Sequence, residues 1–153
     1  MSAIPAPTMA VSRRRLKRRH LWLIPGLAVG VLASTLAGQR DLGLLPLLVF
    51  GIVPHLSVLV GFGQPHVRGQ LAPRAVPLFN AIHHPALPLA TVGLAAAGVL
   101  STFWLVGALA WLAHIVVDWA LGDGLRSANG FLLGRFGRMT GIGSPSVPVG
   151  EEG

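Results

Sequence analysis

The sequence has no cysteine and few charges, and most of the charges it has are positive. Of 153 residues, twelve are Lys or Arg, five are Asp or Glu, and 52% are hydrophobic. The absence of cysteine excludes disulfide bonds, thiol catalysis and thiolate metal sites. Charged residues make up only 11% of the chain, whereas soluble domains carry about 25%. This scarcity of charge excludes an ordinary water-soluble globular domain and predicts a membrane protein.

Three charge-free runs set the expected number of membrane spans. Residues 21–39 and 42–66 contain no Asp, Glu, Lys or Arg, and residues 75–117 continue for 43 residues without one. As a helix the third run would extend roughly 65 Å, about two crossings of a ~30 Å hydrocarbon core. The sequence therefore predicts an all-α, polytopic membrane protein with four transmembrane helices, at about 21–38, 42–61, 76–97 and 102–121.

The same pattern divides the chain into three parts. Residues 1–20 are predicted to form a disordered basic tail, and residues 21–125 the four-helix transmembrane domain. Residues 126–153 are predicted to form a cytoplasmic interfacial segment followed by a second disordered tail. The outermost residues at both ends are rich in proline, glycine and serine, a composition that favours disorder.

The basic residues predict an orientation. They gather in the segment RRRLKRR (13–19), in the loop between the second and third predicted helices, and after the fourth. Such residues favour the cytoplasmic side, so we expect a multi-pass inner (plasma) membrane protein with both termini in the cytoplasm. The basic tail is expected to bind anionic inner-leaflet lipids, at about 1 kcal/mol per residue. The sequence contains no RNA-binding pattern, so no nucleic-acid partner is expected. A homo-oligomer is a possible partner state, since four short helices would bury more surface in one.

Ionisable residues inside the predicted spans fall at one depth, although each costs a few kcal/mol there. His55 lies near the inner end of the second helix, and His83 lies about two turns into the third. His114 and Asp118 lie in the last two turns of the fourth helix, four residues apart and therefore about 6 Å apart on one face. With both termini inside, the sequence predicts one polar cluster that opens toward the cytoplasm.

Prolines adjoin the histidines of the second and third predicted helices. Pro54 precedes His55, Pro85 follows His84, and each proline removes a helical hydrogen bond. Such breaks are tolerated in membrane helices where the backbone lines a cavity or meets polar groups. His84 is about 100° around the helix from His83, so it is expected to face away from the cluster.

Three histidines and an aspartate from different helices suit a divalent metal, Zn²⁺ or Mn²⁺, bound by neutral imidazole nitrogen and carboxylate oxygen. A water on such a metal has its pKa lowered to about 7 and can attack an ester or phosphodiester. Two alternatives stay open. In one, the cluster is a structural network, in which Asp118 fixes the His114 tautomer and Asn80 cross-links helices. In the other, His83 and His114 are axial ligands of haem.

Three blocks carry a family resemblance: VPHLSVLVG (53–61), PLFNAIHHPALP (77–88) and WLAHIVVDWALGDGLRSANGF (111–131). In order and spacing they resemble a small bacterial membrane family, the domain of unknown function 4260 family. The resemblance covers about residues 21–137 and implies a four-helix integral membrane protein. Besides Pro88 and Leu125, the matching positions are the cluster residues His83, His114 and Asp118 and four expected supporting polar or turn residues, Ser57, Asn80, Gly122 and Gly124.

The chain departs from the family pattern at two positions near the cluster. The family usually has Asp where His55 stands, a change that keeps a metal ligand and removes a charge. It usually has Arg where Trp119 stands, so Asp118 loses an ion-pair partner and is freer to bind something else. More distantly, the order Pro-Asp, His and His-x₃-Asp is similar to that of LexA-regulated, membrane-bound metal-dependent hydrolases.

Two hypotheses follow from these patterns. In the first, the protein is a metal-dependent hydrolase of a lipid or other membrane ester, with His83, His114 and Asp118 as ligands. His55 is then a fourth ligand or a general base. In the second, the protein is not an enzyme, and the cluster joins helices or binds a partner protein. A transporter is disfavoured, because the polar residues stop half-way across the predicted membrane.

Overall fold

The structure is a computed structural model that describes residues 20–134, and most of these residues are helical. The elements are α2 (Leu23–Gln39), α3 (Leu45–Leu56) with its 3₁₀ continuation η1 (Ser57–Gly61), η2 (Pro73–Ala75), α4 (Val76–His83), α5 (Ala86–Ala96), α6 (Thr102–Leu121), β1 (Leu125–Arg126) and β2 (Leu132–Gly134). The predicted helical class is confirmed. The predicted basic tail and the final tail, residues 1–19 and 135–153, lie outside the described residues.

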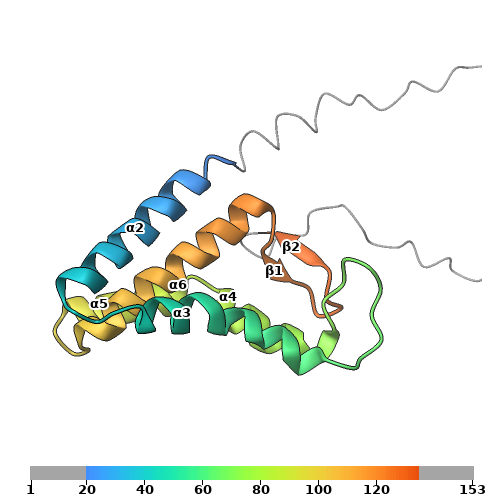
Figure 1. Ribbon diagram of the computed structural model, residues 1–153. Coiled ribbons are helices and arrows are strands. Elements are labelled where there is room, and N and C mark those ends of the chain that lie inside the picture. The colour runs from blue at the N-terminus through green and yellow to red at the C-terminus, as the bar shows by residue number, and fades with distance from the viewer. Residues whose placement is uncertain (1–19, 135–153) are drawn as a thin grey trace, which may run out of the picture.

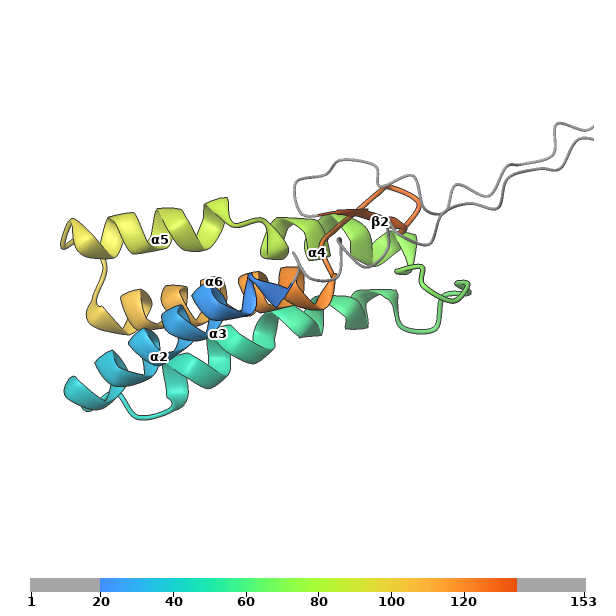
Figure 2. The ribbon, with the colours of Figure 1, turned by 90° about the horizontal axis from the view of Figure 1, so that it is seen from above.

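Helix α6 is the centre of the fold. Helices α2, α3 and α5 each pack along it, whereas α2 and α3 make little contact with each other. Figure 1 shows α2 and α3 diverging from the turn that joins them, and Figure 2 shows α5 on the opposite side of α6. Helix α6 therefore contacts both α2 and α3 where these two helices diverge.

Small residues allow α2 to approach α6 closely. Gly26, Ala33 and Ala37 are its buried positions, spaced so that they lie along one side of the helix. A Cβ added at Gly26 would lie 3.0 Å from Cγ2 of Val117, so no larger side chain fits without a shift. Close packing through small residues is the usual contact between helices in lipid.

An aromatic ring fills the contact between α3 and α6. The Phe50 ring lies directly over the backbone of Gly107, and a Cβ added there would overlap the ring. Phe50 also packs edge-on against Trp104, with ring centroids 5.5 Å apart, and lies beside Trp111 at 6.3 Å. This contact fixes how far α3 stands from α6, five residues before His55.

The third predicted span is not one helix, which corrects the sequence prediction. Helix α4 ends at His83, and His84 adopts an extended conformation with ψ 125°. The reason is local: a residue before proline is pushed out of the helical region, and Pro85 has no N–H to continue the helix. The indole of Trp111 donates a hydrogen bond to the Ile82 carbonyl at 2.8 Å, so a side chain caps the broken end.

Helix α6 ends in a turn and a small hairpin that the all-α prediction did not include. Gly122 adopts φ +98°, and the N–H groups of Gly122 and Asp123 donate to the Asp118 carbonyl at 2.9 and 2.8 Å. This left-handed cap favours glycine. Strands β1 and β2 then pair antiparallel, with Leu125 opposite Gly134. Strands of two and three residues are too short for a periodic sequence signal.

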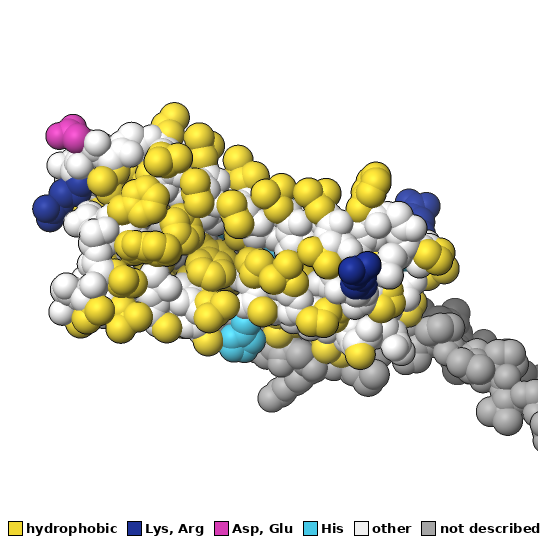
Figure 3. All heavy atoms as spheres, turned by 90° about the horizontal axis from the view of Figure 1, so that it is seen from below, with side chains coloured by type: hydrophobic (Ala, Val, Ile, Leu, Met, Phe, Trp, Pro, Cys, Tyr) yellow, Lys and Arg dark blue, Asp and Glu magenta, His cyan; other side chains and the backbone are white. Residues whose placement is uncertain are grey.

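Large apolar side chains cover much of the exterior. Among the described residues, α6 is the one helix long and apolar enough to cross a membrane, and α2 and the α3–η1 segment are shorter apolar helices. Exposed leucine, isoleucine and valine side chains occur along α2, α3 and α5, and Phe62 is 89% exposed. Figure 3 shows hydrophobic side chains along the whole length of one face, with basic residues toward its ends.

Candidate metal centre

The structure brings the four cluster residues together from three helices. His55 comes from the last turn of α3, His83 ends α4, and His114 and Asp118 lie in the last two turns of α6. The three histidines each offer a ring nitrogen, and these nitrogens lie within 4.8 Å of one another. The break before Pro85 ends α4 at His83, next to the C-terminal part of α6.

His83 is held in one orientation and one tautomer. Its side chain is 5% exposed, and its ring stacks on Phe79 with centroids 3.9 Å apart and planes 15° apart. Its Nδ1 lies 2.9 Å from the Phe79 carbonyl oxygen. A carbonyl only accepts hydrogen bonds, so Nδ1 carries the proton and donates it. In the neutral ring Nε2 then presents a lone pair to the cluster.

Three atoms form a triangle of the size that a metal requires. The His114 Nε2 atom lies 3.2 Å from Asp118 Oδ2 and 3.5 Å from His83 Nε2, and the His83 Nε2 atom lies 3.7 Å from Asp118 Oδ2. Zinc ligands at about 2.0–2.1 Å in a tetrahedron are separated by roughly 3.3–3.4 Å. The three atoms therefore form one face of such a tetrahedron without a large movement.

The electrostatics of the triangle favour a cation at its centre. If His114 Nε2 carries a proton and donates it to Asp118, the lone pair of His83 Nε2 still faces the carboxylate oxygen at 3.7 Å. Two hydrogen-bond acceptors that converge need a donor or a cation between them. A proton or a bound water gives a structural network, and a metal ion gives a metal centre.

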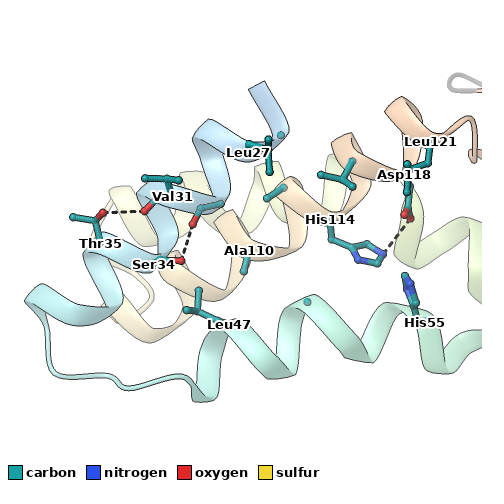
Figure 4. Close-up of a pocket in the computed structure, with 15 residues that line it drawn as sticks. Leu27, Val31, Ser34, Thr35, Leu47, His55, Ala110, His114, Asp118 and Leu121 are labelled. Atoms are coloured by element: carbon teal, nitrogen blue, oxygen red, sulfur yellow. Dashed lines mark hydrogen bonds and ion pairs between the residues drawn. The ribbon is translucent and has the colours of Figure 1, made fainter. Parts of the chain in front are cut away.

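His55 stands at the open side of the cluster. It is exposed, and its ring centroid lies 4.4 Å from that of His114. Figure 4 shows its side chain extending from α3 toward His114 and Asp118. One of its ring nitrogens lies within 4.8 Å of a ring nitrogen of each of the other two histidines. His55 therefore suits a fourth ligand or a base that contacts a bound water.

The predicted supporting residues lie around the cluster and do not join it. Asn80 Nδ2 donates to the Arg126 carbonyl at 2.7 Å, and the Arg126 N–H donates to Asn80 Oδ1 at 2.8 Å. Asn80 therefore links α4 to β1 rather than to another helix. Ser57 is buried and its hydroxyl donates to the Pro54 carbonyl at 2.6 Å. Gly122 caps α6, and Gly124 is buried in the turn that follows.

Three residues near the site were missed by sequence reasoning. Phe79 supplies both the stacking surface and the carbonyl for His83. The Arg126 guanidinium lies 5.8 Å from the centre of the Phe79 ring and pairs with Asp123. Trp111 caps α4. The signal for Phe79 was available, because it lies four residues before His83 on the same helix face.

An open cleft of about 650 Å³ leads to the cluster between α2 and α3 (Figure 4). We call it the α2–α3 cleft, and the residues that line it are Gly26, Leu27, Gly30, Val31, Ser34, Thr35, Leu47, Gly51, His55, Ala110, Ala113, His114, Val117, Asp118 and Leu121. By contrast, His84 lies outside the cleft, exposed between the end of α4 and the start of α5. Its Nδ1 accepts a hydrogen bond from the Ala86 N–H at 3.3 Å.

Comparison with known families decides the family assignment. Residues 21–139 match the family described as domain of unknown function (DUF4260). The chain belongs to this family. No curated protein and no solved structure matches the chain. The matched DUF4260 region contains all four cluster residues, both strands and the whole α2–α3 cleft.

Proposed function

We propose that the protein is an integral membrane hydrolase that uses one divalent metal ion, zinc or manganese, to cleave a lipid or other membrane ester. One observation carries the proposal: His83 Nε2, His114 Nε2 and Asp118 Oδ2 lie 3.2 to 3.7 Å apart, close to the roughly 3.3–3.4 Å edge of a zinc tetrahedron. The side that the triangle leaves open, toward His55, provides room for water and substrate.

The exterior supports a membrane location. A soluble monomer rarely exposes contiguous apolar patches larger than a few hundred Å², and here exposed apolar side chains run along α2, α3 and α5. Arg126 Nη1 donates to the Gly69 carbonyl at 3.3 Å, so the hairpin and the loop that carries Arg68 lie together at the cluster end. Basic residues favour the cytoplasmic side. The proposed topology therefore has four spans, with α4 and α5 together making the third and both termini in the cytoplasm.

The residues of the cluster have separate roles in the proposed reaction. A metal held by His83, His114 and Asp118 would supply a Lewis acid that polarises the ester carbonyl and activates water. Hydrolysis adds the oxygen of one water to the carbonyl carbon and breaks the bond between that carbon and the alcohol oxygen. His55 takes the proton from the water and returns it to the leaving oxygen. The bond from His83 Nδ1 to the Phe79 carbonyl keeps its ring aimed at the centre.

Metal content is the first test of this function. The full-length protein is purified in detergent, and its metals are measured by mass spectrometry beside His114→Ala and Asp118→Ala. We expect nearly one zinc or manganese per chain in the wild type and loss of the metal in both variants. The matched control is His84→Ala, which changes an exposed histidine outside the triangle and should keep the metal.

The role of His55 is tested by two substitutions. His55→Asp introduces the residue that the family pattern usually has, and it should retain ester hydrolysis and metal. His55→Ala should keep the metal and lose about 10²–10⁴-fold in kcat if the side chain is the base. A folded wild-type protein that contains no metal and hydrolyses no vesicle ester would overturn the proposal. The cluster would then be an interhelical hydrogen-bond network, with Asp118 bound to His114.

A further inference from the structure

The α2–α3 cleft is polar at one end only. Its ionisable lining residues, His55, His114 and Asp118, all lie at the end formed by the C-terminal parts of α3 and α6. Toward the other end the lining consists of glycine, alanine, leucine and valine with two hydroxyl residues. Figure 4 shows Thr35 and Leu47 at this second end, away from the dashed bond between His114 and Asp118.

The two hydroxyl residues of the cleft do not make it polar. Ser34 Oγ donates to the Gly30 carbonyl at 2.9 Å, and Thr35 Oγ1 donates to the Val31 carbonyl at 2.9 Å. Both bonds lie within α2, so the hydroxyl protons are already used and a cleft occupant has no need to supply partners for them. An occupant therefore meets an apolar channel that ends in a cluster of imidazole and carboxylate groups.

Glycines keep the cleft open. A Cβ added at Gly51 of α3 would meet no atom within 4 Å, and one added at Gly30 of α2 would meet only the Ala113 Cβ, at 3.8 Å. Along α3, His55 comes eight positions after Leu47, which corresponds to about 12 Å. The α2–α3 cleft therefore runs for about this distance along α3 and reaches the cluster at His55.

We infer that the α2–α3 cleft holds one acyl chain of an ester lipid, with the ester at the cluster and the chain running toward Thr35 and Leu47. The inference rests on the proposed function and names its substrate class: an amphiphile with an ester at the top of a single inserted chain. The cleft and the lipid change polarity in the same way along their lengths. The polar end of the cleft contacts the ester, and its apolar remainder contacts methylene groups.

The cleft sets position rather than affinity. An acyl chain in a bilayer is already out of water, so its transfer to an apolar cleft gains little hydrophobic free energy. The cleft instead fixes where the chain lies along its length, so that the ester carbon of a bound chain comes to His55 and the triangle. A test must therefore measure where each part of the chain lies, and not only whether lipid binds.

The experiment uses the full-length protein in phosphatidylcholine vesicles that contain a photoactivatable lipid. One probe carries a diazirine next to the ester, and a second carries it near the end of the chain. Labelled peptides are mapped by mass spectrometry. We expect the first probe to label residues around His55 and Leu121, and the second to label residues around Thr35 and Leu47. Equal labelling of all exposed helices by both probes would mean a lipid annulus only and would overturn the inference.

Filling the cleft provides the matched comparison. Gly51→Leu places a side chain in open space inside the cleft, and it should lower cleft labelling by about tenfold because a packed side chain excludes the probe. Gly93→Leu is the control, since Gly93 on α5 also has nothing within 4 Å and lies outside the cleft. Its labelling pattern should equal that of the wild type. Unchanged cleft labelling in Gly51→Leu would count against the inference.

Two further variants separate this inference from the proposed function. His114→Ala removes a metal ligand but leaves the apolar lining, so it should retain the chain-end labelling at Thr35 and Leu47. The same pattern in a wild-type protein that contains no metal and hydrolyses no ester would overturn the hydrolase and support the acyl site. Gly51→Cys adds the sole cysteine of the chain. Disulfide-linked dimers of this variant in the membrane would assign the cleft to a second copy and overturn the acyl site.

Discussion

The two ends of the helical bundle are held together in different ways. At the cluster end, side chains bond to distant parts of the backbone: Asn80 to Arg126, Trp111 to Ile82, and Gln70 to the Asn129 carbonyl at 2.7 Å. At the other end, the hydroxyls of Ser34, Thr35 and Thr91 bond to carbonyls four residues back in their own helices. Directional bonds fix distances to tenths of an ångström, which a metal triangle needs. Apolar packing tolerates an open cleft.

Removal of the metal should have the largest effect on the stability of the protein, and it should act at the cluster end alone. A metal present at about 1,000 times its Kd stabilises the folded state by about 4 kcal/mol. We expect a chelator to lower the Tm of the wild type, measured by tryptophan fluorescence in detergent, and to leave the Tm of His114→Ala unchanged. An equal shift in both proteins would show that the chelator acts elsewhere.

Gly107→Val should have the next largest effect, because it acts on the contact that positions α3. The new side chain would overlap the Phe50 ring, and overpacking of this kind costs about 3 kcal/mol. It should also displace His55, five residues farther along α3 than Phe50, and so lower ester hydrolysis. Thermal unfolding and ester hydrolysis are the measurements, with Gly93→Val as control. Retention of both stability and hydrolysis would contradict the packing argument.

Asn80→Leu should destabilise the cluster end by about 2 kcal/mol. It leaves both the N–H and the carbonyl of Arg126 without the partners seen at 2.7 and 2.8 Å, and unpaired buried backbone groups cost about 1–3 kcal/mol. Asn80→Asp, which keeps the acceptor for the Arg126 N–H and loses the donor to its carbonyl, should fall between the wild type and Asn80→Leu. The order of the three Tm values is the measurement.

Trp111→Phe should cost about 1 kcal/mol, close to the net contribution of one hydrogen bond. The variant keeps an aromatic ring beside Phe50 and loses the indole N–H that caps Ile82. Its effect should appear as faster amide exchange around the break at His84 rather than as global unfolding. Unchanged exchange at this break would mean that water or a neighbouring group caps the carbonyl equally well.

Ser34→Ala should have the smallest effect, within about 0.5 kcal/mol, because its hydroxyl bonds only to its own helix. The change leaves the cleft at least as apolar as before. Thermal unfolding should therefore be unchanged, and so should the proposed labelling pattern of the lipid probes. A loss of more than about 1 kcal/mol would show that the apolar end depends on a polar contact after all.

The proximity of the three histidines could be predicted from their depths in the expected spans. Helix direction placed His55, His83 and His114 at one level, and the structure has their ring nitrogens within 4.8 Å of one another. Asp118 lies beside His83 and His114. The boundaries of α2 and α6 also lie close to the predicted ones. Both results depend on long, regular signals: charge-free runs and the period of the helix.

Features that depend on tertiary contacts could not be read from the sequence. Asn80 was expected to bridge helices, but it pairs with a hairpin whose strands have two and three residues. The third span was expected to be continuous, although His84 next to Pro85 carried a sign of the break. The cleft depends on the spacing between α2 and α3, which the Phe50 ring over Gly107 helps to set.

The position of the cluster in the chain has a consequence for biosynthesis. His55 and His83 leave the ribosome before α6 is made. Helix α6 then supplies the last two members of the cluster, His114 and Asp118. Because chains are made and folded from the N-terminus, the two early histidines have no carboxylate to complete the triangle until the last helix packs. A truncated nascent chain therefore has no complete centre, and assembly of the whole bundle is the step that creates one.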